Sequence, residues 1–174
     1  MMKKYDSRTD TQNHIGMVKV ITEALSSELY NRGIIHDESK LSDPEKETFD
    51  RVTPLLKSLT YGSGDYKAAL ESMGDALEHH YKNNRHHPEH FKRGISGMNI
   101  VDLVEMFCDW CAATERHDDG SIGRSISQQA RRFEFGPVLA NIFLNTATDF
   151  NIGKNHESTN QDYFREEISK GGKI

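Results

Sequence analysis

The sequence has little of what marks disulfide-stabilised proteins, membrane or secreted proteins, and proteins that bind nucleic acid broadly. Its only cysteines, Cys108 and Cys111, are too few for a disulfide framework. No apolar run approaches the ~18–20 residues that a membrane span needs, and no apolar stretch follows the two lysines near the N-terminus as it would in a secretory signal. The net charge of -5 at pH 7 leaves no broad basic face for nucleic acid. We therefore expect a cytoplasmic protein that binds neither membranes nor nucleic acid broadly.

Apolar residues recur at three- and four-residue steps, which is the helical pattern. The first stripe consists of Ile15, Val18, Ile21, Leu25 and Leu29. It predicts a helix from about residue 11 to residue 32, ended by Gly33. A second, short and buried segment, most simply another helix, should then begin at Ile34.

The rest of the chain repeats this pattern. We expect a helix opened by Asp43-Pro44 and kinked or split by Pro54, a helix over 65–81, a long loop over 83–97, a helix capped by Asn99, and helices over 125–133 and from Pro137. No stretch alternates with period two. The sequence thus predicts an all-α fold, a single bundle of about six or seven helices over residues 1–150, followed by a polar C-terminal extension over 151–174.

Side chains that bind divalent metals well occur at four places separated by whole helices. These are His14, His36-Asp37, His79-His80 and Asp109. Asp109 is also the last member of an acidic row, with Asp102 and Glu105, on a helix that is otherwise apolar. Burying such a row without partners would cost several kcal/mol, so a metal ion or histidines should accompany it.

The order His, His-Asp, His-His, Asp resembles that of the HD superfamily of metal-dependent phosphohydrolases, and the likeness covers roughly residues 10 to 145. His36-Asp37-Glu38-Ser39-Lys40-Leu41 resembles the HD-x-x-K-[IL] signature, and Ala76-Leu77-Glu78-His79-His80 resembles the helix ending in HH of HD-GYP domains. Phe107 to Thr114 is similar to their V-A-D-x-x-D-A-x-T segment. The HD-x-S-K variant with a histidine-rich loop also resembles small HD-like proteins of phages and bacteria, where the location would be the host cytoplasm.

This resemblance implies a set of roles. The implied metal ligands are His14, His36, Asp37, His79, His80 and Asp109, holding one or two divalent ions such as Mn, Fe or Mg. Asp37 and Lys40 would take part in catalysis, and Lys40, Arg85, His86 and His87 would contact the substrate. The implied activity is hydrolysis of a nucleotide or another small phosphoester by a metal-activated water.

The sequence also departs from the HD-GYP pattern. The GYP tripeptide is absent, and no histidine occurs between residues 38 and 78, where HD-GYP domains place a middle ligand. Asp10, Glu45 and Glu47 stay open as further ligands. His86, His87 and His90 also stay open, either as members of the site or as solvent-facing loop residues beside it. The departures keep a second interpretation in view, an HD-like protein that binds a metal or a nucleotide without turnover. A third is a helical protein whose histidines are polar core residues, and the sequence leaves homo-oligomerisation open.

Overall fold

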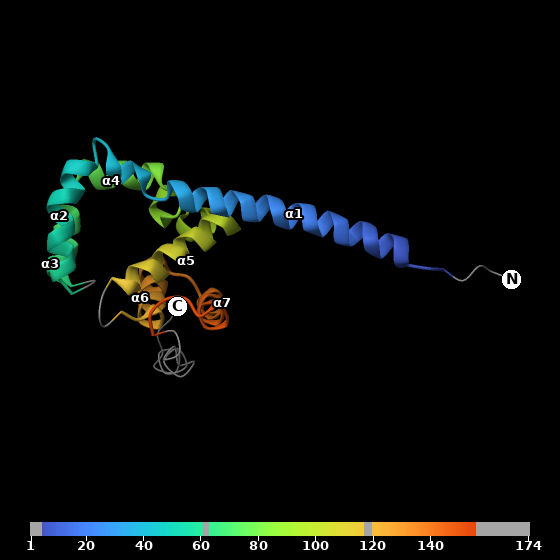
Figure 1. Ribbon diagram of the computed structural model, residues 1–174. Helices are drawn as coiled ribbons and strands as arrows, with labels where there is room; N and C mark the ends of the chain where they lie inside the picture. Colours follow the sequence, from blue (N-terminus) through green and yellow to red (C-terminus); the bar gives the residue numbers. More distant parts are fainter. Residues whose placement is uncertain (1–4, 61–62, 117–119, 156–174) are drawn as a thin grey trace. The chain divides into compact units, whose positions relative to one another are not determined.

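The computed structural model describes residues 5–60, 63–116 and 120–155, and this part of the chain is all-helical (Figure 1). Seven α-helices and three 3-10 helices lie in it, and none of its residues forms a strand. The elements are α1 (Arg8–Ile35), η1 (Glu38–Leu41), α2 (Lys46–Ser58), α3 (Gly64–Glu71), α4 (Asp75–Asn83), η2 (Pro88–His90), η3 (Gly94–Gly97), α5 (Ile100–Glu115), α6 (Ile122–Phe133) and α7 (Pro137–Phe150). The predicted all-α class and number of helices are confirmed.

The chain divides into two compact units, Met1–His36 and Asp37–Ile174. The sequence placed one domain over residues 1–150, so the division falls inside that range. Of the predicted extension over 151–174, residues 156–174 lie outside the described part of the chain.

The first unit consists of α1, a single uninterrupted helix of 28 residues (Figure 1). Gly33 and Ile34 belong to this helix, and Ile34 and Ile35 are 66% and 55% exposed, so the prediction of a helix end at Gly33 and a buried segment after it was wrong. Glycine inside a helix costs only about 1 kcal/mol relative to alanine, and this is too little to end the helix against the turns around it. None of the residues of α1 is buried.

The second unit begins with one confirmed helix and one departure from the predicted helices. Of the two effects predicted for Pro54, a split is absent, because Pro54 lies inside the continuous helix α2. The predicted helix over 65–81 is instead two helices, α3 and α4, which meet at Gly74 with φ of 49°. A positive φ is a conformation that glycine adopts readily and that a continuous right-handed helix excludes.

The hydrophobic core of the second unit lies among α5, α6 and α7. Asn99 caps α5 as predicted, and its side chain accepts from the backbone N–H groups of Val101 and Asp102. Pro137 stands in the first turn of α7. The buried cluster consists of Met106, Phe107, Trp110, Cys111, Ile122, Ile126, Ala130, Phe135, Ala140, Phe143, Leu144 and Ala147. This core fixes α5, the helix that carries Glu105 and Asp109.

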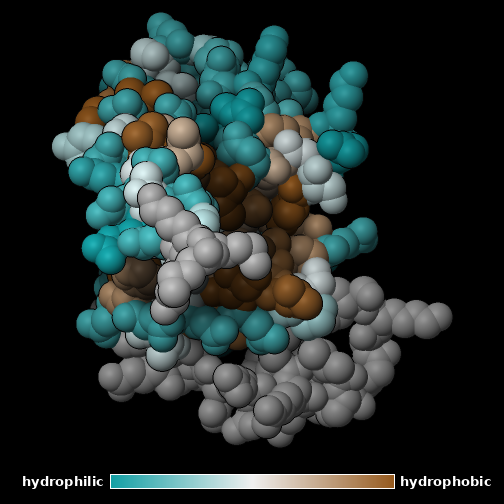
Figure 2. All heavy atoms as spheres, turned by 90° about the vertical axis from the view of Figure 1, so that its right-hand side faces the viewer, coloured by the Kyte–Doolittle hydropathy of each residue, from teal (hydrophilic) through white to brown (hydrophobic). Residues whose placement is uncertain are grey.

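Large hydrophobic side chains are also exposed in both units. Val18 and Ile21 of α1 are 47% and 55% exposed, and Val138 and Ile142 of α7 are 74% and 53% exposed. Figure 2 shows one face of the molecule, on which hydrophobic residues gather between hydrophilic ones. In the second unit, Val138 and Ile142 line a cavity of about 450 Å³ between η3 and the start of α7, and this cavity includes none of the clustered histidines described below.

Candidate metal centre

Asp37 opens the second unit in a conformation that few residues other than glycine adopt. Its φ is 58° and its ψ is 14°, in the left-handed region, which aspartate tolerates better than most residues. The two oxygens of its carboxylate have different neighbours. Oδ2 accepts a hydrogen bond from Lys40 Nζ at 2.5 Å, and Oδ1 lies 3.4 Å from Nε2 of both His80 and His86.

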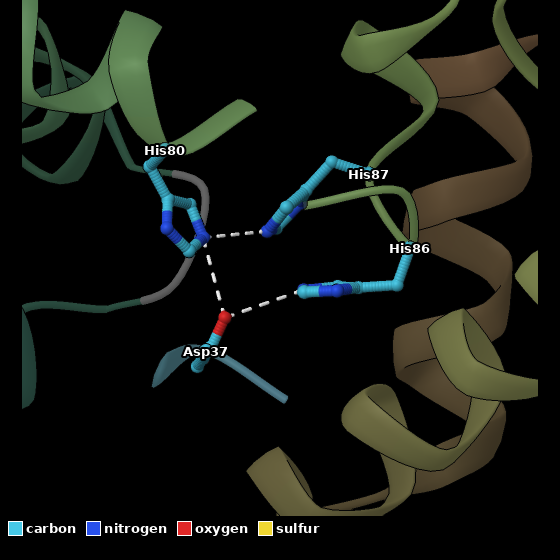
Figure 3. Close-up of side chains that lie close together, drawn as sticks. All are labelled: Asp37, His80, His86 and His87. Carbon is cyan, nitrogen blue, oxygen red and sulfur yellow. Dashed lines mark hydrogen bonds and ion pairs between the residues drawn. The ribbon is translucent and has the colours of Figure 1, made fainter. Parts of the chain in front are cut away.

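Three histidines converge on this carboxylate from two segments of the second unit. His80 comes from the last turn of α4, and His86 and His87 come from the short segment between α4 and η2. His80 Nε2 lies 2.8 Å from His87 Nε2. One ligand atom from each of Asp37, His80, His86 and His87 lies within 4.8 Å of all the others, and the four side chains point toward a common centre (Figure 3).

Two histidines of this cluster are shielded from water, whereas Asp37 and His87 are partly exposed. His80 and His86 are 2% exposed and Asp37 is 20% exposed. Burial, followed by the nearby positive charge of Lys40, lowers the pKa of His80 below its ordinary value of 6.5, against the opposing effect of Asp37 and Glu45. His80 is therefore neutral at physiological pH, and neutral imidazole is the form that binds metals.

Glu45, the residue before α2, lies behind His80 with no exposed surface. Its Oε2 is 2.9 Å from His80 Nδ1 and its Oε1 is 2.7 Å from His79 Nδ1. Ser39 Oγ donates to Oε2 at 3.0 Å. The sequence left open whether Glu45 is a ligand, and the structure places it against the far side of the imidazole, on Nδ1 rather than Nε2.

Two members of the acidic row of α5 contact side chains of the segment that carries His86 and His87. Asp102, fully buried, accepts from Nε and Nη2 of Arg85 at 3.0 and 2.9 Å. Glu105 Oε1 lies 3.2 Å from His86 Nδ1. A carboxylate oxygen of Asp109 lies within 4.8 Å of one of Asp37. Of the partners expected for the buried row, a histidine is present at Glu105, whereas Asp102 is paired with Arg85.

Of the six predicted metal ligands, the structure places Asp37 and His80 in the four-residue cluster, and Asp109 close to Asp37 but outside that cluster. His79 is 39% exposed and contacts Glu45. His14 and His36 belong to the first unit, at the two ends of α1; 22 residues at 1.5 Å per residue separate them by about 33 Å. A continuous α1 therefore cannot bring the side chains of His14 and His36 to the same ion. Their roles as ligands stay predictions.

The four residues predicted to contact the substrate fall into two groups, two cations that are paired with carboxylates and two histidines of the cluster. Lys40 is paired with Asp37, and Arg85 is paired with Asp102 and stacked on the ring of Phe91. His86 and His87 are members of the metal-binding cluster itself. The sequence predicted these two as substrate contacts and left their membership in the metal site open. It did not show that Glu105 is the partner of His86 or that Glu45 is the partner of His80. The signal available was the second His-His doublet, seven residues after the first.

The fold and the cluster together define an all-helical protein with a buried group of histidines and carboxylates close enough to hold a metal ion. Within the residues described, no helix has the length and apolar character that crossing a membrane requires. The chain belongs to a protein family of unknown function, DUF5662, whose model matches residues 3–149. No curated protein and no solved structure gives a significant match.

Proposed function

We propose that this chain is a metal-dependent phosphohydrolase of the HD type, acting on a nucleotide or another small phosphoester. The observation that carries the proposal is the convergence of Asp37, His80, His86 and His87, whose ligand atoms all lie within 4.8 Å of one another. The resemblance of the sequence to the HD superfamily supports the type of reaction.

The distances within the cluster fit ligands that share one ion. Metal–nitrogen and metal–oxygen bonds are about 2.0–2.2 Å long, so two ligands at tetrahedral or octahedral angles lie about 2.8–3.6 Å apart. The corresponding distances here are 2.8 Å from His80 to His87 and 3.4 Å from Asp37 to both His80 and His86. Imidazole with one carboxylate is a donor set suited to Mn, Fe or Zn.

The residues around the cluster have separate tasks in this proposal. A bound divalent ion supplies an activated water near neutral pH and polarises the phosphoryl oxygen. Lys40 holds a positive charge beside Asp37, where it would offset the charge of an incoming phosphoryl group. Glu105 orients His86 through Nδ1, so that Nε2 faces Asp37.

The test is metal analysis of the purified protein, followed by a panel of nucleotides, cyclic nucleotides and model phosphodiesters assayed with added Mn²⁺. We expect bound metal, and hydrolysis that is lost in His86→Gln. His90→Gln is the matched control, because His90 lies on η2 close by in sequence but hydrogen-bonds the backbone carbonyl of Tyr81. Absence of metal together with absence of hydrolysis would refute the proposal.

A second candidate function is binding of a metal or a nucleotide without turnover. The observation that favours it is that Lys40 and Arg85, the cations expected to hold a phosphate, are each paired with a carboxylate of the protein. A thermal-shift screen would separate the two functions. Stabilisation by a nucleotide in the presence of metal, with no product formed, favours binding alone.

A further inference from the structure

The carboxylate of Glu45 is fully buried and faces two adjacent histidines at once. Oε1 reaches His79 Nδ1 at 2.7 Å and Oε2 reaches His80 Nδ1 at 2.9 Å. Ser39 Oγ donates to Oε2 at 3.0 Å. A buried carboxylate is tolerated when hydrogen-bond donors surround it, and here three side chains can donate to it.

These contacts determine which nitrogen of His80 carries the proton. An ionised carboxylate accepts hydrogen bonds and donates none, so the Nδ1 atoms of His79 and His80 must be the donors. Asn84 Nδ2 also lies near His80 Nδ1, but its two hydrogens serve Ser39 Oγ and the His80 carbonyl oxygen, both at 2.8 Å. Nδ1 of His80 therefore keeps its own hydrogen, and Nε2 presents a lone pair toward Asp37 and His87.

We propose that Glu45 is a positioning residue that fixes His80 as the Nδ1–H tautomer, and that His80 alone of the His79-His80 pair is a metal ligand. His79 is the second hydrogen-bond donor that holds the Glu45 carboxylate in place. The ligand role of His80 rests on the proposed function, whereas the tautomer rests on hydrogen bonding alone.

The arrangement also joins two elements of the second unit. Glu45 directly precedes α2, whereas His79 and His80 stand in the second half of α4. The two hydrogen bonds that the rings donate to one buried carboxylate restrict the rotation of both rings, so His80 is aimed at the cluster before any ion arrives. Removing a carboxylate that hydrogen-bonds a metal-ligating histidine typically lowers metal affinity roughly 10- to 100-fold.

The direct test is the tautomer of each histidine in the ¹⁵N-labelled, metal-free, full-length protein, read from long-range ¹H–¹⁵N correlations. We expect His79 and His80 to carry hydrogen on Nδ1. In Glu45→Gln the amide has a single acceptor oxygen, so at least one ring should lose this state. Glu47→Gln is the matched control, since Glu47 is exposed and only two residues away. An Nε2–H tautomer at His80 in the wild-type protein overturns the proposal.

Zn²⁺ affinity, measured by competition with a chromogenic chelator, tests the consequence for binding. We expect Glu45→Gln to weaken Zn²⁺ binding roughly 10- to 100-fold, with Glu47→Gln unchanged. His80→Gln should abolish the site, whereas His79→Gln should weaken binding about 10-fold or less. Equal losses in His79→Gln and His80→Gln overturn the assignment of His80 as the sole ligand of the pair.

The two proposals fail in distinguishable ways. If the wild-type protein binds no metal, the proposed function fails, and the tautomer measurement still decides the role of Glu45. If Glu45→Gln does not fold, Ser39→Ala removes one donor to the same carboxylate, and the wild-type spectrum needs no variant.

Discussion

Replacing Asp102 with Asn should destabilise the protein by about 2 kcal/mol. Asp102 is fully buried and accepts two hydrogen bonds from Arg85, each charge-assisted and worth about 1.5–3 kcal/mol. The side chain of Arg85 is 44% exposed, so water compensates part of the loss and we take the lower end for the pair. Asparagine keeps one acceptor oxygen and nearly the same volume.

The assay is urea unfolding followed by circular dichroism at 222 nm, together with thermal unfolding. For a chain of this size 2 kcal/mol corresponds to a fall in Tm of about 4–8 °C. Asp149→Asn, at an exposed position of α7, is the control that should change neither value. Because Arg85 immediately precedes His86, metal affinity should fall as well. A loss below about 0.5 kcal/mol, or one equal to that of the control, would show that this pair does not anchor the histidine segment.

Three further predictions concern other groups of the second unit. Burial raises the pKa of Cys111 to about 12, and Cys108 is exposed, so mass spectrometry after alkylation at pH 8 should find Cys108 modified first; faster labelling of Cys111 would contradict this. Because the pKa of His80 is lowered in the folded protein, the unfolded chain binds a proton at this residue more readily. The free energy of unfolding of the metal-free protein, measured by urea titration, should therefore fall as the pH falls below 6.5. The part of this pH dependence that comes from His80 should vanish in His80→Gln. A Cβ at Gly97 would lie 2.8 Å from Cβ of Phe91, so Gly97→Ala should lower the free energy of unfolding by about 1–3 kcal/mol, and an unchanged unfolding midpoint would show that the loop simply moves.

Local signals in the sequence predicted most of the helices. Asn99 and Pro137 mark helix starts through interactions with the next few residues, and these starts are confirmed. Residues that only disfavour a conformation were less informative. Pro54 and Gly33 both lie inside helices, although glycine costs about 1 kcal/mol and proline about 3 kcal/mol there, because the surrounding turns together outweigh one unfavourable residue.

The candidate site was predicted less completely, because its members meet through tertiary structure. The sequence singled out Asp37, His80 and Asp109 through their motif order. It could not rank His86 and His87 as ligands, since a segment without helical periodicity gives no indication of where its side chains point. Nor could spacing show that Glu45 lies behind His80, because 34 residues and two helices separate Glu45 from His79.

The most direct test of the central claim is equilibrium Zn²⁺ binding to the metal-free protein, compared between His86→Gln, His87→Gln and the control His90→Gln. We expect binding in the wild type and in His90→Gln, and a loss of at least about 100-fold in the other two variants. Wild-type affinity in His86→Gln and His87→Gln would contradict it, because the cluster of Asp37 with three histidines would then not be the metal site.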